Sequence, residues 1–218
     1  MNRKVARRVA LLSALVISTQ VAVRTEAATV IHSDRSAFTA ELVSSFTDTY
    51  GAELGYPGSF GILSNAAMSA VVGQTRYQST GFNNHNIVVN GTYCAGCNGS
   101  FKLDFADTGY SKNGGVFGAG LDILANGNGL YDALVTFANG SSALYGLSGG
   151  GFWGITSHLG IASIAFGPEG GQSKGGYFQI DNLSIGTVPE PSTWLLLIAG
   201  FGMVGFGLRR KPIAVTLS

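Results

Sequence analysis

The sequence predicts an all-β protein, an antiparallel β-sandwich or jelly roll with one short N-terminal helix, and three features indicate it. Apolar residues alternate with polar residues or glycine in short runs, the period of a half-buried strand. Asn-Gly pairs, which favour tight hairpin turns, separate several of the runs. Of the 33 glycines, 29 lie between residues 29 and 188, where the regular apolar positions argue against disorder. No repeat of fixed period points to a solenoid or propeller.

The predicted strands each have one apolar face. The clearest runs are residues 101–105, 117–123, 131–137 and 162–166. A further run, residues 177–185, changes parity: Phe178 and Ile180 share one face, whereas Leu183 and Ile185 fall on the other. A β-bulge at Asp181-Asn182 would return all four apolar residues to the core and redirect the Asp181 carboxylate.

One helix is predicted, from Asp34 to Ser44. Ser33 can cap its N-terminus, and Phe38 and Leu42 are four residues apart, which places both on the side that would pack against the sheet.

The N-terminus has the pattern of a signal peptide over residues 1–27. Four basic residues precede the apolar run 9–17, and Thr25 and Ala27 match the small residues that signal peptidase requires, so cleavage is expected after Ala27. The exported domain is then residues 28–187, enough for one substantial core.

A second apolar segment lies near the C-terminus. Trp194 to Leu208 carries no charge and is followed by Arg209, Arg210 and Lys211. As a helix it is about 22 Å long, and Ser192, Thr193 and snorkelling basic side chains bring it near the roughly 30 Å of a bilayer core. We therefore expect a transmembrane helix, with Trp194 at one interface. By the positive-inside tendency, the chain between the two apolar segments lies across the membrane from the cytoplasm.

Pro189-Glu190-Pro191, the glycine-rich apolar segment and the basic cluster together resemble the PEP-CTERM sorting signal of exported proteins of Gram-negative bacteria, over residues 188–211. The resemblance implies recognition and cleavage by an exosortase in bacteria that make extracellular polysaccharide. It implies export through the inner membrane, a transient membrane-anchored precursor with residues 212–218 as a short cytoplasmic tail, and a final place at the cell surface or outside the cell. Such segments also occur on some ice-binding proteins.

Charge argues against a nucleic-acid partner. The chain has 13 basic and 12 acidic residues, but eight of the basic and two of the acidic ones lie outside residues 29–188. The domain therefore keeps 5 basic and 10 acidic residues, a net charge of −5. Nucleic-acid binding needs a basic surface instead.

Cys94-Ala95-Gly96-Cys97 contains both cysteines of the chain. A thiol-redox motif would begin a helix, and zinc would need about four ligands. In an oxidising compartment we expect Cys94 and Cys97 to form a structural disulfide. No cofactor is predicted apart from the calcium considered below.

Two classes of function remain open for the domain. The first is a non-enzymatic protein associated with carbohydrate, specifically exopolysaccharide. The second is a secreted polysaccharide hydrolase, for which Asp104, Asp122 and Asp132 are the strand residues able to supply two carboxylates to one cleft. Ice binding would require a regular array of threonines, and none repeats here.

Trp153 and Asp181 are the residues most relevant to a ligand. Trp153 is flanked by glycines and would contact a sugar if exposed, whereas its shared parity with Ile155 favours the core. Residues 176–186 resemble the closing strand of jelly-roll carbohydrate-binding modules, which implies a structural calcium at Asp181. The alternative is that Asp181 stabilises a turn without metal.

Overall fold

Antiparallel strands dominate the computed structural model, which describes residues 29–95, 99–127, 131–167, 177–187 and 191–208. The twelve strands of the described part are β1 Thr29–His32, β2 Ser44–Asp48, β3 Phe60–Leu63, β4 Arg76–Ser79, β5 Asn86–Val89, β6 Thr92–Cys94, β7 Phe101–Asp104, β8 Val116–Asn126, β9 Asp132–Phe137, β10 Ser142–Gly146, β11 Gly151–Gly167 and β12 Phe178–Thr187. The helices are α1 Arg35–Ala40, α2 Asn65–Val72 and α3 Pro191–Leu208, with short 3-10 turns at Ala52–Leu54 and Phe82–Asn84. The predicted all-β class is confirmed.

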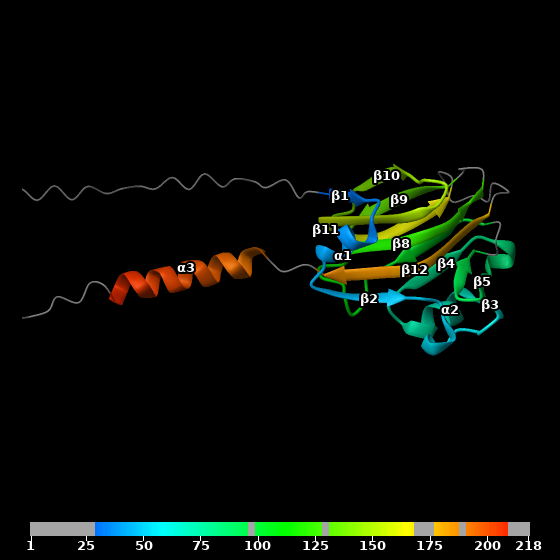
Figure 1. Ribbon diagram of the computed structural model, residues 1–218, viewed down its shortest axis with the longest axis horizontal. Helices are drawn as coiled ribbons and strands as arrows, with labels where there is room; N and C mark the ends of the chain where they lie inside the picture. Colours follow the sequence, from blue (N-terminus) through cyan, green and yellow to red (C-terminus); the bar gives the residue numbers. More distant parts are fainter. Residues whose placement is uncertain (1–28, 96–98, 128–130, 168–176, 188–190, 209–218) are drawn as a thin grey trace, which may run out of the picture.

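The strands form one hydrogen-bonded sheet (Figure 1). Its main order is β10-β9-β11-β8-β12-β6-β5-β3; β1 and β7 also pair with β11, β2 with β12, and β4 with β7. Every strand pair is antiparallel, as hairpin turns between consecutive strands allow.

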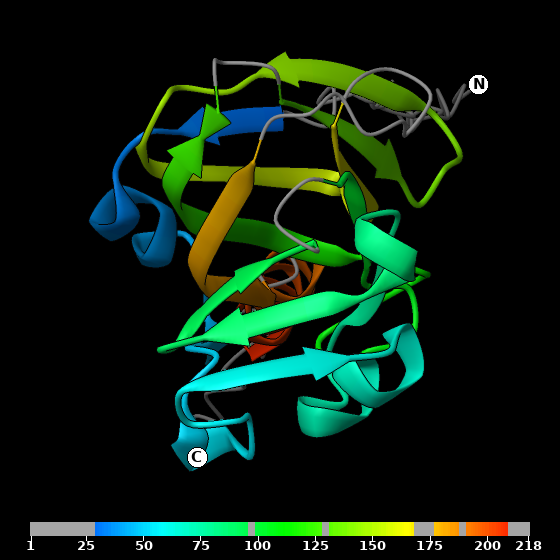
Figure 2. The same ribbon diagram turned by 90° about the vertical axis from the view of Figure 1, so that its right-hand side faces the viewer.

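The long strand β11 bends the sheet around its core. Residues 151–156 pair with β8, whereas the strand from Ile161 onward pairs with β9, and residues 163–166 also pair with β7. The register with β9 shifts between Ile161 and Ser163. Gly160, just before the shift, has a φ of +71°, which a residue with a side chain rarely adopts. Because the two halves of β11 have different neighbours, the sheet curls around an enclosed interior (Figure 2).

The interior is aromatic and matches the predicted alternation. The core includes apolar residues from all four predicted runs: Phe101, Leu103, Phe105, Ala119, Leu121, Ile123, Tyr131, Ala133, Val135, Phe137, Ile164 and Phe166. The Phe166 ring lies 5.0 Å from Phe101 and 5.4 Å from Phe178, centroid to centroid. Such contacts stabilise a core beyond the burial of area alone.

The bulge predicted in β12 is confirmed. The pairing with β8 shifts between Asp181 and Ser184, and Asn182 has a φ of +50°. Because of this extra residue, apolar side chains before and after it are all at most 1 % exposed: Phe178, Ile180, Leu183 and Ile185.

Helix α1 is shorter than predicted and has a different cap. The carboxylate of Asp34, not the hydroxyl of Ser33, accepts the Ala37 N–H at 2.8 Å, and the helix ends at Ala40. Phe38 is fully buried, as expected, while Leu42 lies beyond the helix. Asp34 takes the cap because its backbone is extended and its side chain reaches the free N–H groups of the first turn.

Helix α2 was not predicted. The Ser64 hydroxyl accepts the Ala67 N–H at 3.2 Å at its start, and Gly73 ends it with a φ of +76°. Met68 is its buried residue. The hairpin turns were better predicted: Asn90-Gly91 and Asn113-Gly114 all have positive φ.

The first and last described strands of the domain leave it at the same end. Across the sheet, Val30 pairs with Thr156, Thr156 with Gly118, Gly118 with Gly186, and Gly186 with Ser45. Strands β1 and β12 are therefore three strand spacings apart in one row, about 14 Å. Helix α2 and strands β3 and β5 lie at the opposite end (Figure 1).

Candidate functional site

A cleft of about 530 Å³, lined mostly by polar residues, opens beside α2. This helix lies at the end of the domain away from the two exits (Figure 1). Helix α2 from its first residue, the segment that joins it to β4, strand β4 and the turn after β7 form the walls of the cleft. Its main polar side chains are Asn65, Gln74, Arg76, Gln78, Asp104 and Asp107.

Several of these side chains are held by neighbours. Arg76 Nη2 lies 2.7 Å from Asp107 Oδ2, and both side chains are about two-thirds exposed. Gln74 Oε1 accepts the Gly109 N–H at 3.0 Å, which ties the segment after α2 to the turn after β7. Asp104 accepts the Ala106 N–H at 3.1 Å. The cleft therefore presents positioned amide, guanidinium and carboxylate groups to solvent.

Beneath the cleft, Asp48, Tyr50, Tyr56 and Tyr77 form a buried network that we name the Asp48 cluster. Asp48 is 3 % exposed; its Oδ2 accepts the hydroxyls of Tyr56 at 2.6 Å and Tyr77 at 3.2 Å, and its Oδ1 accepts the Tyr50 N–H at 3.0 Å. Desolvation raises the pKa of Asp48, although these hydrogen bonds oppose the shift. This cluster was not predicted from the sequence.

Tyrosine rings surround the Asp48 carboxylate. The hydroxyl oxygens of Tyr77 and Tyr50 lie 3.2 Å apart, and the Tyr50 ring stacks on Tyr93 at 5.5 Å. Burial raises the pKa of Tyr50, Tyr77 and Tyr93 well above the ordinary value, so their hydroxyls remain donors. The network fixes Tyr77, which forms the floor of the cleft.

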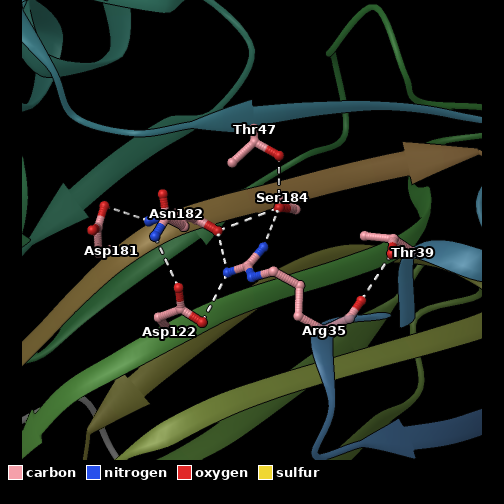
Figure 3. Close-up of polar contacts among 7 residues, drawn as sticks. All are labelled: Arg35, Thr39, Thr47, Asp122, Asp181, Asn182 and Ser184. Atoms are coloured by element: carbon pink, nitrogen blue, oxygen red, sulfur yellow. Dashed lines mark hydrogen bonds and ion pairs between the residues drawn. The ribbon is translucent and has the colours of Figure 1, made fainter. Parts of the chain in front are cut away.

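A second polar group, the Arg35 cluster, lies at the bulge in β12 and consists of Arg35, Asp122, Asn182 and Ser184 (Figure 3). The Arg35 guanidinium lies 3.0 Å from Asp122 Oδ1 and donates to Ser184 Oγ at 2.8 Å and to the Asn182 carbonyl at 3.0 Å. Asn182 Nδ2 donates to Asp122 Oδ2 at 2.9 Å. Arg35 also stacks over the Phe152 ring at 4.7 Å.

Asp181 stabilises this bulge. Its Oδ1 accepts the N–H of Asn182 at 2.6 Å. Desolvation, and to a smaller extent the nearby Asp122, raise the pKa of the Asp181 carboxyl. In the described part of the chain no three His, Cys, Asp or Glu side chains gather as metal ligands would, and the positive charge beside Asp122 comes from Arg35. The bond to the Asn182 N–H fits the predicted role of Asp181 in a turn, and calcium at Asp181 stays a prediction.

Trp153 is not an exposed sugar platform. It is 5 % exposed, lies opposite Leu121 in the sheet, and packs edge-on against Phe166 at 6.1 Å. Its Nε1 has no hydrogen-bond partner among the described residues. The alternative that Trp153 belongs to the core is the correct one, since it shares the inward parity of the buried Ile155.

The three aspartates considered for hydrolysis do not share a cleft. Only Asp104 lines the cleft; Asp122 belongs to the Arg35 cluster, and Asp132 pairs with Gly146 and Gly167 on β9. Asp107, which was not among the three, is the second carboxylate of the cleft.

Several predicted residues lie outside the described residues. Cys94 is buried at the end of β6, but Cys97 is outside them, so their disulfide stays a prediction. The same holds for the signal peptide, for Pro189 and Glu190, and for the basic residues Arg209, Arg210 and Lys211.

The C-terminal apolar segment is helical: α3 begins at Pro191 and includes Trp194. The transmembrane span predicted for it is not supported, because no helix in the described part of the chain is both long and apolar enough to cross a membrane.

Comparison with known proteins identifies the C-terminal segment. Residues 187–211 match the model of the PEP-CTERM protein-sorting motif. No curated protein matches the chain. The chain thus carries a PEP-CTERM protein-sorting motif, which implies an exported protein that an exosortase processes toward the cell surface.

Proposed function

We propose that the domain is a non-enzymatic polysaccharide-binding module that acts at the cell surface or in the extracellular matrix after exosortase sorting. The polar cleft beside α2 carries this proposal. It is open, so a polymer can pass through it without an end having to enter, and Arg76, Gln78 and Asp107 present donors and acceptors that match sugar hydroxyls.

The charge of the domain favours a neutral polymer. Residues 29–188 have a net charge of −5, although in the cleft Asp107 is paired with Arg76 and Asp104 with Lys102. The domain as a whole would repel an acidic polysaccharide, whereas a neutral glycan needs only the hydrogen-bonding groups of the cleft.

The position of the cleft also fits this role. Both described ends of the domain, Thr29 and Thr187, lie at one end of the sheet, and helix α2, which lines the cleft, lies at the other (Figure 1). A polymer bound there stays clear of Thr187, the residue at which the sorting motif begins.

Binding to the producer's own exopolysaccharide by the full chain tests the proposal. Replacing Arg76 and Gln78 with alanine removes several hydrogen bonds and should weaken binding about tenfold or more, while the melting temperature stays nearly constant because both side chains are exposed. Ser142→Ala, at an exposed position on β10, is the matched control. Full binding by the double variant would rule the cleft out.

A hydrolase remains the second candidate because Asp104 and Asp107 share the cleft. Release of new reducing ends from the same polysaccharide would favour it, provided that Asp104→Asn and Asp107→Asn each abolish the release. Binding without release favours the module.

A further inference from the structure

Strand β3, Phe60–Leu63, is an open edge of the sheet. It is the last strand of the main order, and among the described strands it pairs with β5 alone. The segment from Gly58 to Ser64 contains no charged residue and no proline, the features that usually protect an edge strand from pairing.

The alternating hydrogen-bond pattern between β3 and β5 shows which backbone groups of β3 face the open edge. The Asn90 N–H donates to the Ser59 carbonyl at 3.0 Å, which makes Ser59 and Asn90 a hydrogen-bonded pair in the register that places Phe60 opposite Val89. Such pairs alternate along an antiparallel ladder. The backbone N–H and C=O groups of Phe60 and Ile62 therefore point away from β5, and among the described residues no other backbone group pairs with them.

The same two residues have exposed side chains. Phe60 is 58 % and Ile62 is 55 % exposed, and their cross-strand neighbours Val89 and Ile87 are half-buried on the same face. We name these four residues the β3 strip. An apolar strip beside unpaired backbone groups is a surface for strand addition.

We propose that the β3 strip binds the β3 strip of a second copy of this chain, with the two strands antiparallel about a two-fold axis. If Gly61 lies opposite the Gly61 of the second copy, Phe60 of each copy lies opposite Ile62 of the other. These are the residues whose N–H and C=O groups are available, so the register forms four backbone hydrogen bonds. The two strips then form one continuous apolar surface across the axis.

Three features favour a second copy as the occupant. The order Phe60-Gly61-Ile62 is self-complementary in this register, as a two-fold interface requires. The strand lacks charges that would select an oppositely charged partner. The β3 edge also lies away from the end at which Thr29 and Thr187 leave the domain (Figure 2 and Figure 1).

A proline substitution tests the pairing with little effect on the fold. Ile62→Pro removes an N–H that faces the open edge and leaves the bonds between β3 and β5. Leu144→Pro is the matched control: the Phe137 N–H donates to the Ser141 carbonyl, so by the same alternation Leu144 faces the open edge of β10, and its side chain is 53 % exposed.

Sedimentation velocity of the full chain in detergent micelles, over a series of concentrations, provides the measurement. Wild type and Leu144→Pro should show a monomer–dimer equilibrium, and Ile62→Pro should weaken it about tenfold or more. Because the apolar tail is the same in every variant, association through the tail cannot produce this difference.

Other outcomes overturn the proposal. A wild type that remains monomeric, or a dimer unaffected by Ile62→Pro, excludes pairing through β3. Weakening by both proline variants would indicate head-to-tail pairing of β3 with β10 in place of the two-fold dimer. If Ile62→Pro fails to fold, as judged by its melting temperature, Ile62→Lys tests the same edge through the cost of burying a charge.

Discussion

The Asp48 cluster and the Arg35 cluster both contain an aspartate with several hydrogen-bond donors, but they differ in partner and in burial. Asp122 faces a guanidinium, and the two side chains are 27 % and 31 % exposed. Asp48 is 3 % exposed and its side-chain donors are tyrosine hydroxyls. The partly exposed Asp122 thus has a positively charged partner, whereas the buried Asp48 is surrounded by neutral donors.

This difference decides how much each cluster contributes to stability. A partly exposed ion pair gains little, because water and salt weaken the attraction. In a buried network, water cannot replace a lost acceptor. Each donor that loses its acceptor therefore carries the full cost of desolvation. We therefore expect the Asp48 cluster to be the more sensitive of the two.

The largest effect is expected from Asp48→Ala. The substitution leaves the hydroxyls of Tyr56 and Tyr77 and the Tyr50 N–H without their acceptor, at a cost of about 3 kcal/mol or more in the free energy of unfolding. Asp122→Ala should cost about 1 kcal/mol. Urea unfolding of both variants measures the difference, and equal losses would contradict the comparison.

A pH effect follows from the raised pKa of Asp48. Because the folded state holds this proton more tightly than the unfolded state, stability falls as pH rises from the ordinary pKa of 3.8 through the folded pKa, with a slope of at most about 1.4 kcal/mol per pH unit. Asp48→Asn should flatten this fall. Thermal unfolding at several pH values tests it.

The pKa of Asp181 is raised as well, so this carboxyl also makes stability fall as pH rises. Part of the pH dependence should therefore persist in Asp48→Asn. Asp181→Asn, alone and combined with Asp48→Asn, separates the two contributions. A pH dependence unchanged in Asp48→Asn would show that Asp48 does not titrate during folding.

A smaller effect is expected from Arg35→Lys. Lysine keeps the charge but lacks the planar fork that contacts Asp122, Ser184 and the Asn182 carbonyl together, and it stacks less well on Phe152. We expect a loss of about 1 kcal/mol by urea unfolding. A lysine variant as stable as wild type would mean that charge alone matters at this position.

The smallest effect is expected from salt. High ionic strength screens the Arg35–Asp122 pair, so the stability difference between wild type and Asp122→Ala should shrink by a few tenths of a kcal/mol in about 1 M salt. The Asp48→Ala difference should remain constant, because buried hydrogen bonds between neutral and charged groups are screened much less.

Local patterns predicted the strands, and long-range contacts explain what they missed. The parity change at Asp181-Asn182 located the bulge because period two is a property of neighbouring residues. Tyr50 and Tyr56 follow Asp48 closely in the chain, but Tyr77 comes from β4 and meets Asp48 only after separate segments pack together, which no local spacing signals. Helix α2 could have been predicted, because Ser64 is a favourable N-cap and Gly73 a favourable terminator.

The exposure of Trp153 was undecided for a similar reason. Glycines on both sides of a tryptophan suggest an open surface, yet β11 is covered on one side by β8 and its inward face points into an aromatic core. Parity was the more reliable guide because it follows from the backbone, whereas the space left by glycines depends on which other strands approach.

The short distance between β1 and β12 across the sheet has a consequence for protein engineering. Because the two ends of the domain are about 14 Å apart, a linker of roughly five extended residues can connect them. The chain can then be reopened at the exposed turn Asn113-Gly114, which contributes no residue to the core. Such a circular permutant would keep every strand pairing described here while placing its new termini, and any segment fused to them, at a different loop of the domain.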